Sequence, residues 1–392
     1  MQFAELRRLV LIIKEAEAFS KGLEDIVAAE SSICQIDGKN SKLFYRGYDI
    51  HDLAQNSTFE ETAYLLLFGN LPTERQLVDF SNKLASEREL PKGLVQFIQA
   101  FPKTVNPMAA LRTGVSLLSF FDPEAEDKSV ESNVRKAIRL IARTPAIVAY
   151  FDRVRHGESL IAPKTDSSVN TAANFLYMLK GKESASIEVR TLNMYLVLLA
   201  EHDLNASTFA ARTTFSTLSD IYSAITSAVG ALKGDLHGSA NTRSMESLIE
   251  IGDISKVDTF VDGALDNKKK LMGFGHRVYK GPDPRAADLH VMAKELAKTN
   301  AEQAKWYAIS EKLEQAVWTR KKLNCNVDFY SASVLYTIGI PIDLFTTMFA
   351  ISRMAGWMAH VLEQLADNRL IRPISNYVGA APHSYVSIKD RK

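Results

Sequence analysis

The sequence predicts an all-α fold with one short β-hairpin near its N-terminus. From residue 51 onward, segments with helical periodicity follow one another, separated by polar, proline or glycine breaks. Several segments, among them 195–200 and 221–232, are apolar around most of their circumference. Such helices belong inside a large helical protein, because a small bundle leaves one face of each helix in water.

Size and composition predict a folded protein that is long enough for two domains. The chain has 392 residues, of which 46% are hydrophobic and 24% are charged, a profile typical of globular proteins and not of disordered ones. Lys plus Arg (47) nearly balances Asp plus Glu (46), so no overall charge attracts nucleic acid. No apolar run approaches the ~20 residues of a membrane span. We therefore expect neither a nucleic-acid nor a membrane partner.

The N-terminal extension, residues 1–21, is expected to form an amphipathic helix with Phe3, Leu6 and Val10 on one side. Its short apolar core is followed by acidic residues, which fits neither a signal peptide nor a transit peptide. Cys34 and Cys325 lie far apart and form no CxxC pair or His-Cys cluster. We expect buried thiols in a reducing compartment, no metal site, and a cytoplasmic protein.

The hairpin is expected between residues 31 and 46, where apolar stretches flank the turn sequence Asp-Gly-Lys-Asn at 37–40. A break is expected at Pro145, because proline interrupts the helical hydrogen-bond ladder. Asp283 and Pro284 suit the N-cap and first position of a helix. Helices are expected at 58–68, 73–87, 107–119, 134–142, 146–154, 168–179, 187–199, 209–226, 245–251, 284–297, 306–322, 329–338 and 342–365, and the tail from 371 is expected to be irregular.

One loop, residues 271–285, is longer and chemically richer than ordinary connections between helices. Gly273 and Gly275 permit positive φ and let a ligand approach the backbone, while Pro282 and Pro284 stiffen the exit. The loop also carries histidine, arginine and lysine. We expect it to hold a histidine and an arginine in a fixed relation to a bound ligand.

Three of the eight histidines are candidates for chemistry. His237 stands where an apolar helix gives way to small residues and a new helix begins, a place that admits a ligand and favours a neutral imidazole; packing or capping is the alternative. His276 lies in the loop, and His202 is the weaker third candidate. His360 lies among apolar residues and is expected in the core, and the other four are expected in surface or capping roles.

Asp328 heads an apolar run, so burial is expected to raise its pKa and make it a better base. An N-cap role is an equally natural alternative for it. Arg285, Arg353 and Arg372 are each set among helical or proline-bounded residues. Each could hold a ligand carboxylate as a rigid fork, or pair with an acidic side chain.

Taken together, two histidines, one carboxylate and several arginines suit proton abstraction next to a carbonyl, followed by attack on an anionic electrophile. The carboxylate removes the proton, one histidine stabilises the enol oxygen, and the second polarises the acceptor carbonyl. Arginines would hold the carboxylates of the acceptor. No metal motif or phosphate-binding P-loop competes with this interpretation.

Seven motifs, in order and at matching spacing from about residue 22 to the end, resemble the citrate synthase family. The chain is similar to its short, dimeric bacterial and archaeal type, of which 2-methylcitrate synthase is a close relative. The motifs are Tyr-Arg-Gly-Tyr-Asp-Ile at 45–50, His-Asp-Leu-Asn-Ala-Ser-Thr-Phe at 202–209, Leu-His-Gly-Ser-Ala-Asn at 236–241, Gly-Phe-Gly-His-Arg-Val-Tyr at 273–279 with Asp-Pro-Arg at 283–285, Asn-Val-Asp-Phe-Tyr-Ser at 326–331, Ser-Arg-Met-Ala-Gly-Trp at 352–357 and Arg-Pro-Ile-Ser-Asn-Tyr-Val-Gly at 372–379.

The resemblance implies a homodimer in which a large domain, residues 22–234 and 342–392, is interrupted by a smaller helical domain, 235–341, that closes over the substrates. It implies condensation of acetyl-CoA with oxaloacetate and hydrolysis of citryl-CoA to citrate and CoA, the entry to the tricarboxylic acid cycle. No cofactor is implied, since acetyl-CoA is a substrate. Residues 1–21 match no part with a known role in the family.

The resemblance also implies a role for each candidate. Asp328 matches the base that takes the acetyl methyl proton, His237 matches the donor to the enol oxygen, and His276 matches the group on the oxaloacetate carbonyl.

Four further residues match oxaloacetate ligands. Arg285 and Arg353 match carboxylate ligands within the subunit, Arg372 matches the arginine supplied by the neighbouring subunit, and His202 matches an additional contact. In the family, one stretch of the chain lies against the adenine of CoA. The residues that match this stretch here are Leu271, Met272, Gly273, Phe274 and Gly275.

Two other functions are compatible with parts of this pattern. A 2-methylcitrate synthase uses propionyl-CoA with the same catalytic groups, and one methylene changes binding by only ~1 to 3 kcal/mol. A catalytically silent CoA-binding scaffold is expected to have lost some of these residues, whereas this sequence keeps all of them.

Overall fold

The computed structural model describes residues 20–391. It divides the chain into two compact units, which are described one at a time. The main unit is Ser31–Leu370, and the second comprises Met1–Glu30 with Ile371–Lys392. The helix predicted over 1–21 therefore falls, except for its last two positions, outside the described residues.

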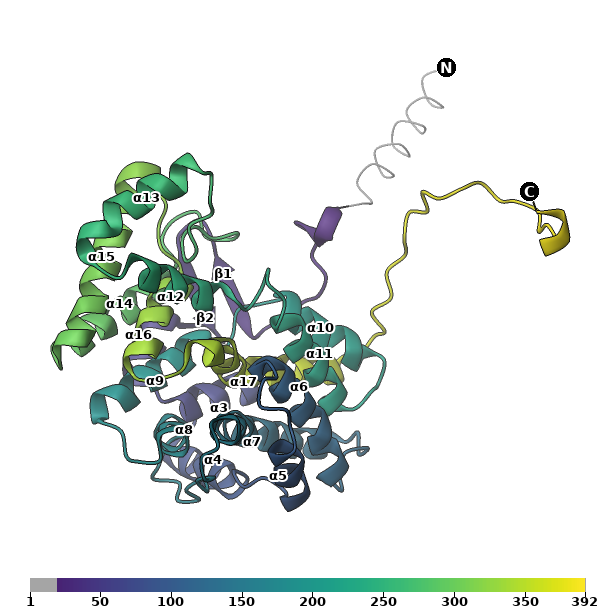
Figure 1. Cartoon of the computed structure of the whole chain (residues 1–392). Coiled ribbons are helices and arrows are strands. Elements are labelled where there is room, and N and C mark those ends of the chain that lie inside the picture. Colours follow the sequence, from purple (N-terminus) through teal and green to yellow (C-terminus); the bar gives the residue numbers. More distant parts are fainter. Residues whose placement is uncertain (1–19, 392) are drawn as a thin grey trace. The chain divides into compact units, whose positions relative to one another are not determined.

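Helices make up most of the main unit (Figure 1), which confirms the all-α prediction. Many of their buried side chains form one hydrophobic core. The α-helices are α2 Ile50–Asn56, α3 Phe59–Phe68, α4 Glu74–Ser86, α5 Lys92–Gln99, α6 Pro107–Leu118, α7 Val130–His156, α8 Thr171–Lys180, α9 Ser186–Leu199, α10 Ala206–Ser216, α11 Ile221–Leu232, α12 Ala240–Ile251, α13 Val257–Asp266, α14 Pro284–Ala297, α15 Ala301–Lys321, α16 Val327–Thr337 and α17 Phe345–Ala366, with 3-10 turns η2 Ser119–Phe121, η3 Ile254–Lys256 and η4 Ile342–Leu344.

The predicted hairpin is present and gains a third strand. Strand β1 (Cys34–Asp37) pairs antiparallel with β2 (Lys42–Tyr45), and β2 pairs with β3 (Tyr48–Asp49). Asp37 closes the predicted turn, since its carboxylate accepts the N–H groups of Lys39 and Asn40 at 3.1 and 3.0 Å. The third strand has only two residues, which is too short to leave a periodic signal in the sequence.

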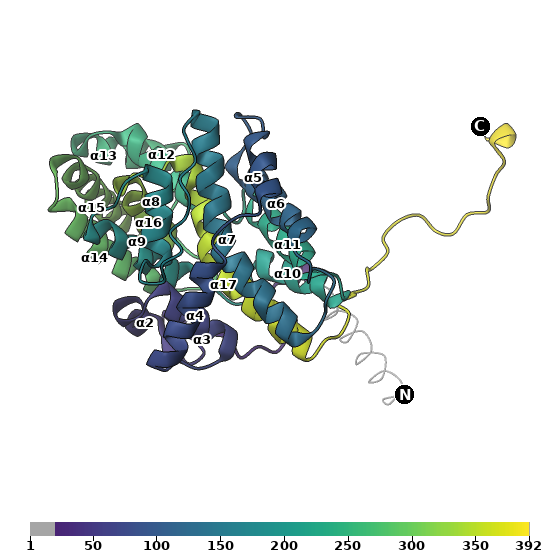
Figure 2. The same cartoon turned by 90° about the horizontal axis from the view of Figure 1, so that it is seen from below.

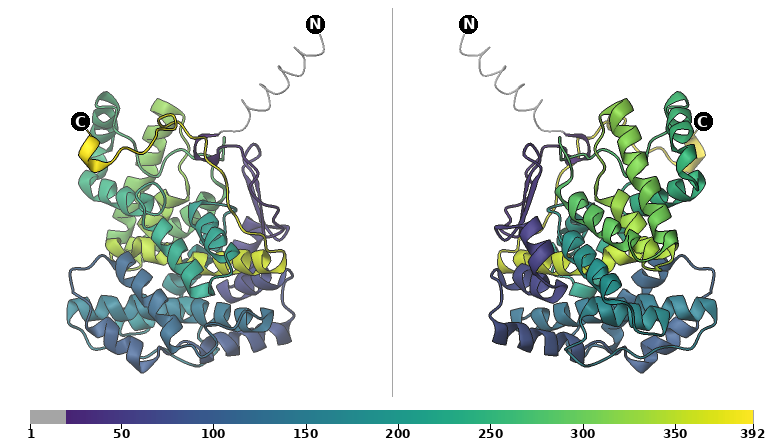
Figure 3. Two further views of the ribbon diagram at one scale, coloured as in Figure 1. Left: turned by 90° about the vertical axis from the view of Figure 1, so that its right-hand side faces the viewer. Right: turned by 90° about the vertical axis from the view of Figure 1, so that its left-hand side faces the viewer.

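Helix α17 runs through the middle of the main unit. Figure 3 shows this yellow-green helix crossing between the blue helices and the green ones, and Figure 2 shows it beside α7. It packs on α3, α7, α9, α10 and α11, and nearly all its side chains from Phe345 to Val361 are buried. A polar side chain on this helix, such as Arg353, is therefore held rigidly by its surroundings.

The predicted break at Pro145 is wrong. Helix α7 continues through Pro145 from Val130 to His156. Proline inside a helix removes one backbone hydrogen bond and costs about 3 kcal/mol. Packing of α7 against α4, α5, α6, α8 and α17 offsets that cost, because most side chains around Pro145 are buried.

The single helix predicted over 209–226 is two helices, α10 and α11. The chain reverses at Leu218, whose φ is 63°. Asp220 then caps α11 by accepting the N–H of Ser223 at 2.9 Å. An aspartate at this position competes with the helix for backbone groups, so it begins a new helix instead of continuing the old one.

Helices α12 to α16 pack mainly on one another, with contacts of α14 and α16 to α9. Figure 1 shows them in green on one side of the main unit. Asp283 is the N-cap of α14 and Pro284 its first residue, as predicted. The loop 271–285 follows α13 and runs into the first two residues of α14.

The second unit is described by itself. Among its described residues are two 3-10 turns, η1 (Lys21–Leu23) and η5 (Ile388–Asp390), and the chain from 371 to 387 has no regular secondary structure. This agrees with the irregular tail predicted from residue 371. Within residues 20–391, no helix combines the length and the apolar surface needed to cross a membrane.

Candidate active site

The loop 271–285 is fastened to the segment that leads into α16. The Gly275 N–H donates to the Asn324 carbonyl, and the Asn326 N–H donates to the Gly273 carbonyl, both at 2.8 Å. Gly273 and Gly275 have φ values of 82° and 75°, a left-handed conformation that glycine adopts without strain. The predicted positive φ of both glycines is thus confirmed, and the backbone of the loop is fixed beside α16.

The stretch predicted to contact CoA lies along this junction. Phe274 is buried and its ring centroid is 4.7 Å from that of Phe329 in α16. Leu271 and Met272 are partly exposed. An apolar side chain therefore anchors the centre of the stretch, while its first residues stay accessible to a ligand.

His276 is held by the backbone of its own loop. Its Nδ1 accepts the N–H groups of Val278 and Tyr279 at 3.0 and 3.2 Å. Burial, and then the positive charge of Arg285, lower the pKa of His276 to about 4, so the imidazole is neutral near pH 7. Because Nδ1 accepts, the proton of the neutral ring is on Nε2 and can be donated to a ligand.

His202 lies next to His276. The two ring centroids are 5.6 Å apart in an edge-on arrangement, and Nε2 of His202 is 3.1 Å from the hydroxyl of Tyr279. Burial, and then the charges of Arg285 and Arg353, lower the pKa of His202 well below its ordinary value. This second imidazole is neutral as well.

His237 lies in the turn between α11 and α12, where its Nε2 is 2.8 Å from the hydroxyl of Ser207. The same hydroxyl accepts the indole N–H of Trp357 at 3.1 Å and donates to Oδ1 of Asn205 at 2.7 Å. Burial, and then Arg353, lower the pKa of His237 to about 4. The hydroxyl has a single proton; in the arrangement in which that proton turns from Asn205 to His237 Nε2, the proton of the neutral His237 ring is on Nδ1 and can be donated to a ligand.

Asp328 stands in the first turn of α16, but it is not the N-cap. The cap is Asn326, whose Oδ1 accepts the Asp328 N–H at 3.0 Å. Burial raises the pKa of the Asp328 carboxyl to about 6, against the opposing effect of Arg285. The shift has the direction that the apolar neighbours predict, and it gives a carboxylate that is ionised yet basic near neutral pH.

Arg285 is paired within the chain before any ligand binds. Its Nε and Nη2 donate to the two carboxylate oxygens of Asp283 at 3.0 and 2.9 Å. Both side chains are buried. Only the other edge of the guanidinium is left for a ligand carboxylate, so Arg285 can bind a substrate without leaving a buried charge unpaired.

Arg353 is placed by α17 and is 1% exposed. Its Nε donates to the carbonyl of Leu199 at 2.8 Å, and its guanidinium carbon lies 4.6 Å from the ring centroid of Phe349. These contacts hold the guanidinium plane and leave its terminal nitrogens for a carboxylate. His202 follows shortly after Leu199, so the arginine and that histidine are supported by one segment.

The predicted residues of the main unit converge on one place. The electrostatic environment of His202 includes Arg285, Arg353, His276 and His237, and Arg285 and Arg353 also act on Asp328. Arg372 is in the second unit, and its contribution stays a prediction. The converging residues come from the end of α9, the α11–α12 turn, the loop, α14, α16 and α17, and are His202, His237, His276, Arg285, Asp328 and Arg353.

Sequence reasoning did not single out three residues that contact the histidines directly or through a hydroxyl: Tyr279, Ser207 and Trp357. All three stand inside motifs that carry the family resemblance, which is the signal that could have found them. No local pattern, however, links Trp357, a buried indole of α17, to Ser207.

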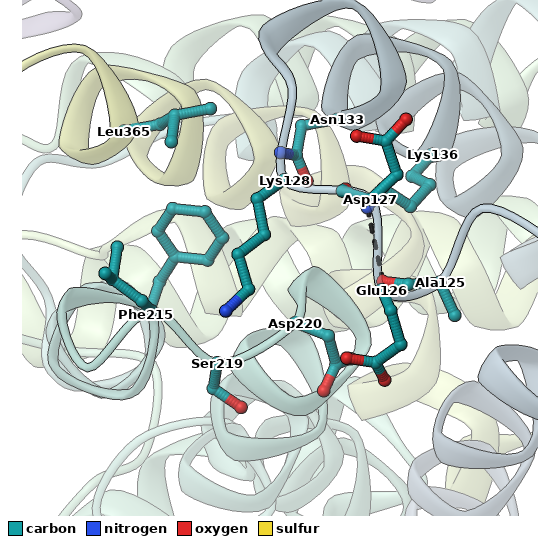
Figure 4. A pocket seen from close by; sticks show the side chains of 11 residues that line it. Ala125, Glu126, Asp127, Lys128, Asn133, Lys136, Phe215, Ser219, Asp220 and Leu365 are labelled. Atoms are coloured by element: carbon teal, nitrogen blue, oxygen red, sulfur yellow. Dashed lines mark hydrogen bonds between the residues drawn. The ribbon is translucent and has the colours of Figure 1, made fainter.

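A small cavity elsewhere in the main unit is lined by none of these residues. It lies between the start of α7, the α10–α11 turn and the end of α17, with Lys136 and Asp220 in its wall (Figure 4). Its volume of about 20 Å³ is enough for one water molecule. Within the described part of the chain, no group of three or more His, Cys, Asp or Glu side chains is arranged to hold a metal ion.

Comparison with known proteins agrees with this geometry. The sequence model "Citrate synthase, C-terminal domain" matches residues 22–374. The chain belongs to the citrate synthase family. Citrate synthase 2 of Bacillus subtilis (strain 168) is 48% identical over 373 residues, which cover 95% of this chain and 99% of the relative.

Another member of the family, the 2-methylcitrate synthase of Shewanella oneidensis, is 40% identical over 370 residues, 94% of this chain and 97% of the relative. Among solved structures, the ternary complex of carboxymethyl coenzyme A and oxaloacetate with citrate synthase from Thermoplasma acidophilum has a TM-score of 0.88 at 35% identity. That alignment covers 95% of this chain and 99% of the solved one. The citrate synthase fold predicted for this chain is thereby confirmed.

Proposed function

We propose that this member of the citrate synthase family condenses acetyl-CoA with oxaloacetate and hydrolyses the resulting citryl-CoA to citrate and CoA. The observation that carries the proposal is the convergence of a base with a pKa of about 6, two histidines with pKa values of about 4, and two buried arginines. A neutral imidazole donates a hydrogen bond to one oxygen of the substrate. It carries no positive charge that would attract the substrate anions regardless of their orientation. The arginines supply the charge that a dicarboxylate requires.

In the first step, the carboxylate of Asp328 takes a proton from the methyl group of acetyl-CoA. The electron pair of the broken C–H bond forms the C=C bond of the enol, the π pair of the carbonyl moves onto the thioester oxygen, and His237 donates to that oxygen. Burial makes both groups effective, because the base is less solvated and the hydrogen bond is stronger at low dielectric.

In the second step, the enol carbon attacks the keto carbon of oxaloacetate, and the keto oxygen takes up a proton with the help of His276 Nε2. Arg285 and Arg353 hold the oxaloacetate carboxylates, and His202 supplies a further contact. Water then adds to the thioester carbon of citryl-CoA, and CoA leaves as the thiol. Acetyl-CoA is consumed as a substrate, and the scheme needs no resident cofactor.

The oligomeric state of the protein and its cellular location are also part of the proposal. We propose a cytoplasmic homodimer in which Arg372 of one subunit completes the site of the other. We also propose that residues 235–341 form a small domain that closes on residues 22–234 and 342–392, while Leu271, Met272, Gly273, Phe274 and Gly275 line CoA. Support comes from the mutual packing of α12 to α16 and from Gly339, whose φ of 82° breaks the chain before Pro341.

The test is the release of the CoA thiol, measured with a chromogenic thiol reagent. Release from acetyl-CoA should require oxaloacetate and should be lost in Asp328→Asn, which keeps the size of the side chain but cannot accept the proton. Release without oxaloacetate, or release that survives in Asp328→Asn, contradicts the proposal.

A comparison of kcat/KM for acetyl-CoA and propionyl-CoA distinguishes the proposed activity from 2-methylcitrate synthesis, the activity named for the Shewanella relative. We expect acetyl-CoA to be preferred, because the citrate synthase of Bacillus subtilis shares more residues with this chain. Binding of CoA with no turnover of either thioester would support a silent scaffold instead.

A further inference from the structure

Tyr279 packs against both of the histidines that the proposed function assigns to oxaloacetate. Its ring centroid is 4.6 Å from that of His276 and 5.7 Å from that of His202. The side chain is only 3% exposed. A polar group in that position has to be hydrogen-bonded, since an unpaired buried hydroxyl is costly.

The hydroxyl of Tyr279 determines which nitrogen of His202 carries the proton. Its hydrogen-bond partner among the described residues is His202 Nε2, at 3.1 Å. If Nε2 were the donor, the phenol proton would be left without an acceptor in a buried place. Tyr279 therefore donates to Nε2, and the proton of the neutral His202 ring is on Nδ1.

The backbone of the same residue acts on the other histidine. The Tyr279 N–H donates to His276 Nδ1 at 3.2 Å, beside the Val278 N–H at 3.0 Å. Nδ1 is then an acceptor, and the proton of His276 is on Nε2. Tyr279 thus acts on the tautomers of two neighbouring imidazoles, on His202 through its hydroxyl and on His276 together with Val278.

The β-hairpin holds this part of the loop in place. The Lys280 N–H donates to the Gly38 carbonyl at 2.9 Å. A Cβ on Gly38 would lie 2.5 Å from the Val278 carbonyl oxygen, so the close approach of hairpin and loop requires glycine. The predicted turn is consequently a support for the residues on either side of Tyr279.

We propose that Tyr279 is a positioning residue that fixes His202 with its proton on Nδ1 and His276 with its proton on Nε2, so that both imidazoles donate to oxaloacetate. The inference rests on the proposed function and adds a residue to it. A dianionic substrate requires donors at both rings, because a bare ring nitrogen repels a carboxylate or carbonyl oxygen.

The test is Tyr279→Phe, which removes the hydroxyl and keeps the ring and the backbone N–H. We expect the KM for oxaloacetate to rise about 3- to 10-fold, the effect of one net hydrogen bond. The KM for acetyl-CoA should stay within about twofold, since the CoA stretch is not touched. An unchanged KM for oxaloacetate overturns the inference.

A double-mutant cycle with His202→Asn tests whether Tyr279 acts through His202. In the His202→Asn background, Tyr279→Phe should add less than about a twofold change. A full and additive effect overturns the inference, because Tyr279 would then act on the substrate or on the fold directly.

The control is Tyr222→Phe, which removes another buried hydroxyl, one that donates to Asp122 away from the site. It should lower thermal stability without changing the KM for oxaloacetate. A KM change of similar size in both variants overturns the inference, because the loss would then be a general effect of destabilisation.

Calorimetric binding of oxaloacetate without acetyl-CoA separates this inference from the proposed function. A wild-type protein that binds oxaloacetate but releases no CoA refutes the proposed activity alone. In that case a 3- to 10-fold weaker binding by Tyr279→Phe, again about one hydrogen bond, still supports the inference, and equal binding overturns it.

Discussion

The carboxylate of Asp283 accepts the backbone N–H of Val327 at 3.0 Å. The same carboxylate caps α14 and pairs with Arg285. One buried side chain therefore ties the helix of Arg285 to the first turn of the helix that carries Asp328. The distance between these two side chains depends on this junction.

Asp283→Asn should be strongly destabilising, because it leaves the guanidinium of Arg285 without its buried partner. We expect a loss of about 3 to 5 kcal/mol in the free energy of unfolding, measured by urea denaturation, and a higher KM for oxaloacetate. Asp262→Asn is the matched control, since Asp262 pairs with Arg320 at 2.7 Å but its side chain is 58% exposed. Its loss should be below about 1 kcal/mol, and equal losses in the two variants would refute the assigned role.

The rate should depend on pH through Asp328. The base is active when ionised, and its pKa is about 6, so kcat/KM should rise as pH passes upward through 6. Below that pH it should fall about tenfold per unit. The pKa values of His237 and His276 are about 4, so neither adds a transition between pH 5 and 8. A flat profile across this range contradicts the assignment of the base.

Gly273→Ala should disturb the junction between the loop and α16. The φ of Gly273 is 82°, and an added Cβ would stand 2.9 Å from the Cβ of Phe329. We expect lower stability and a higher KM for acetyl-CoA, measured by thermal unfolding and initial rates. Gly263→Ala, within α13 and with open space around its Cβ, should instead stabilise by about 0.5 to 1 kcal/mol. If the two substitutions changed stability equally, the loss in Gly273→Ala would not be due to backbone strain at its positive φ.

Ser207→Ala should lower kcat more than it raises either KM. The hydroxyl joins His237 to Trp357, and without it His237 Nε2 loses the contact that holds the imidazole in position for donation to the enol. A fall of roughly tenfold, or 1.4 kcal/mol, corresponds to one such interaction in the transition state. Ser310→Ala, a buried serine that donates to its own helix at Trp306, should leave kcat unchanged. A normal kcat in Ser207→Ala would show that the hydroxyl does not act on His237.

A shared site predicts complementation between two inactive variants. Asp328→Asn lacks the base and Arg372→Ala lacks the arginine proposed to come from the neighbouring subunit. Mixed dimers contain one site with both native residues, so mixing should restore up to about half of the activity per mixed dimer. Mass spectrometry of differently tagged subunits checks that exchange occurs. Exchange without restored activity excludes the shared site.

Local sequence predicted the backbone structure correctly where neighbouring residues determine it. The turn after β1, the N-cap at Asp283 and the positive φ of Gly273 were all predictable, because each depends on the conformational preferences of one or two residues. The helix through Pro145 and the division between α10 and α11 were not. At Pro145, tertiary packing outweighed the helix-breaking effect of proline. Between α10 and α11, a single capping side chain outweighed the helical periodicity of the sequence.

The sequence predicted the helical class and the family, and it supplied the candidate site residues, because the motifs that resemble the family contain them. The tertiary structure shows how those residues are arranged. The pairing of Arg285 with Asp283, the raised pKa of Asp328 and the contact of Tyr279 with His202 join groups from different segments. Burial and hydrogen-bond geometry act between atoms that are close in space, whereas the sequence records only which residues are neighbours along the chain.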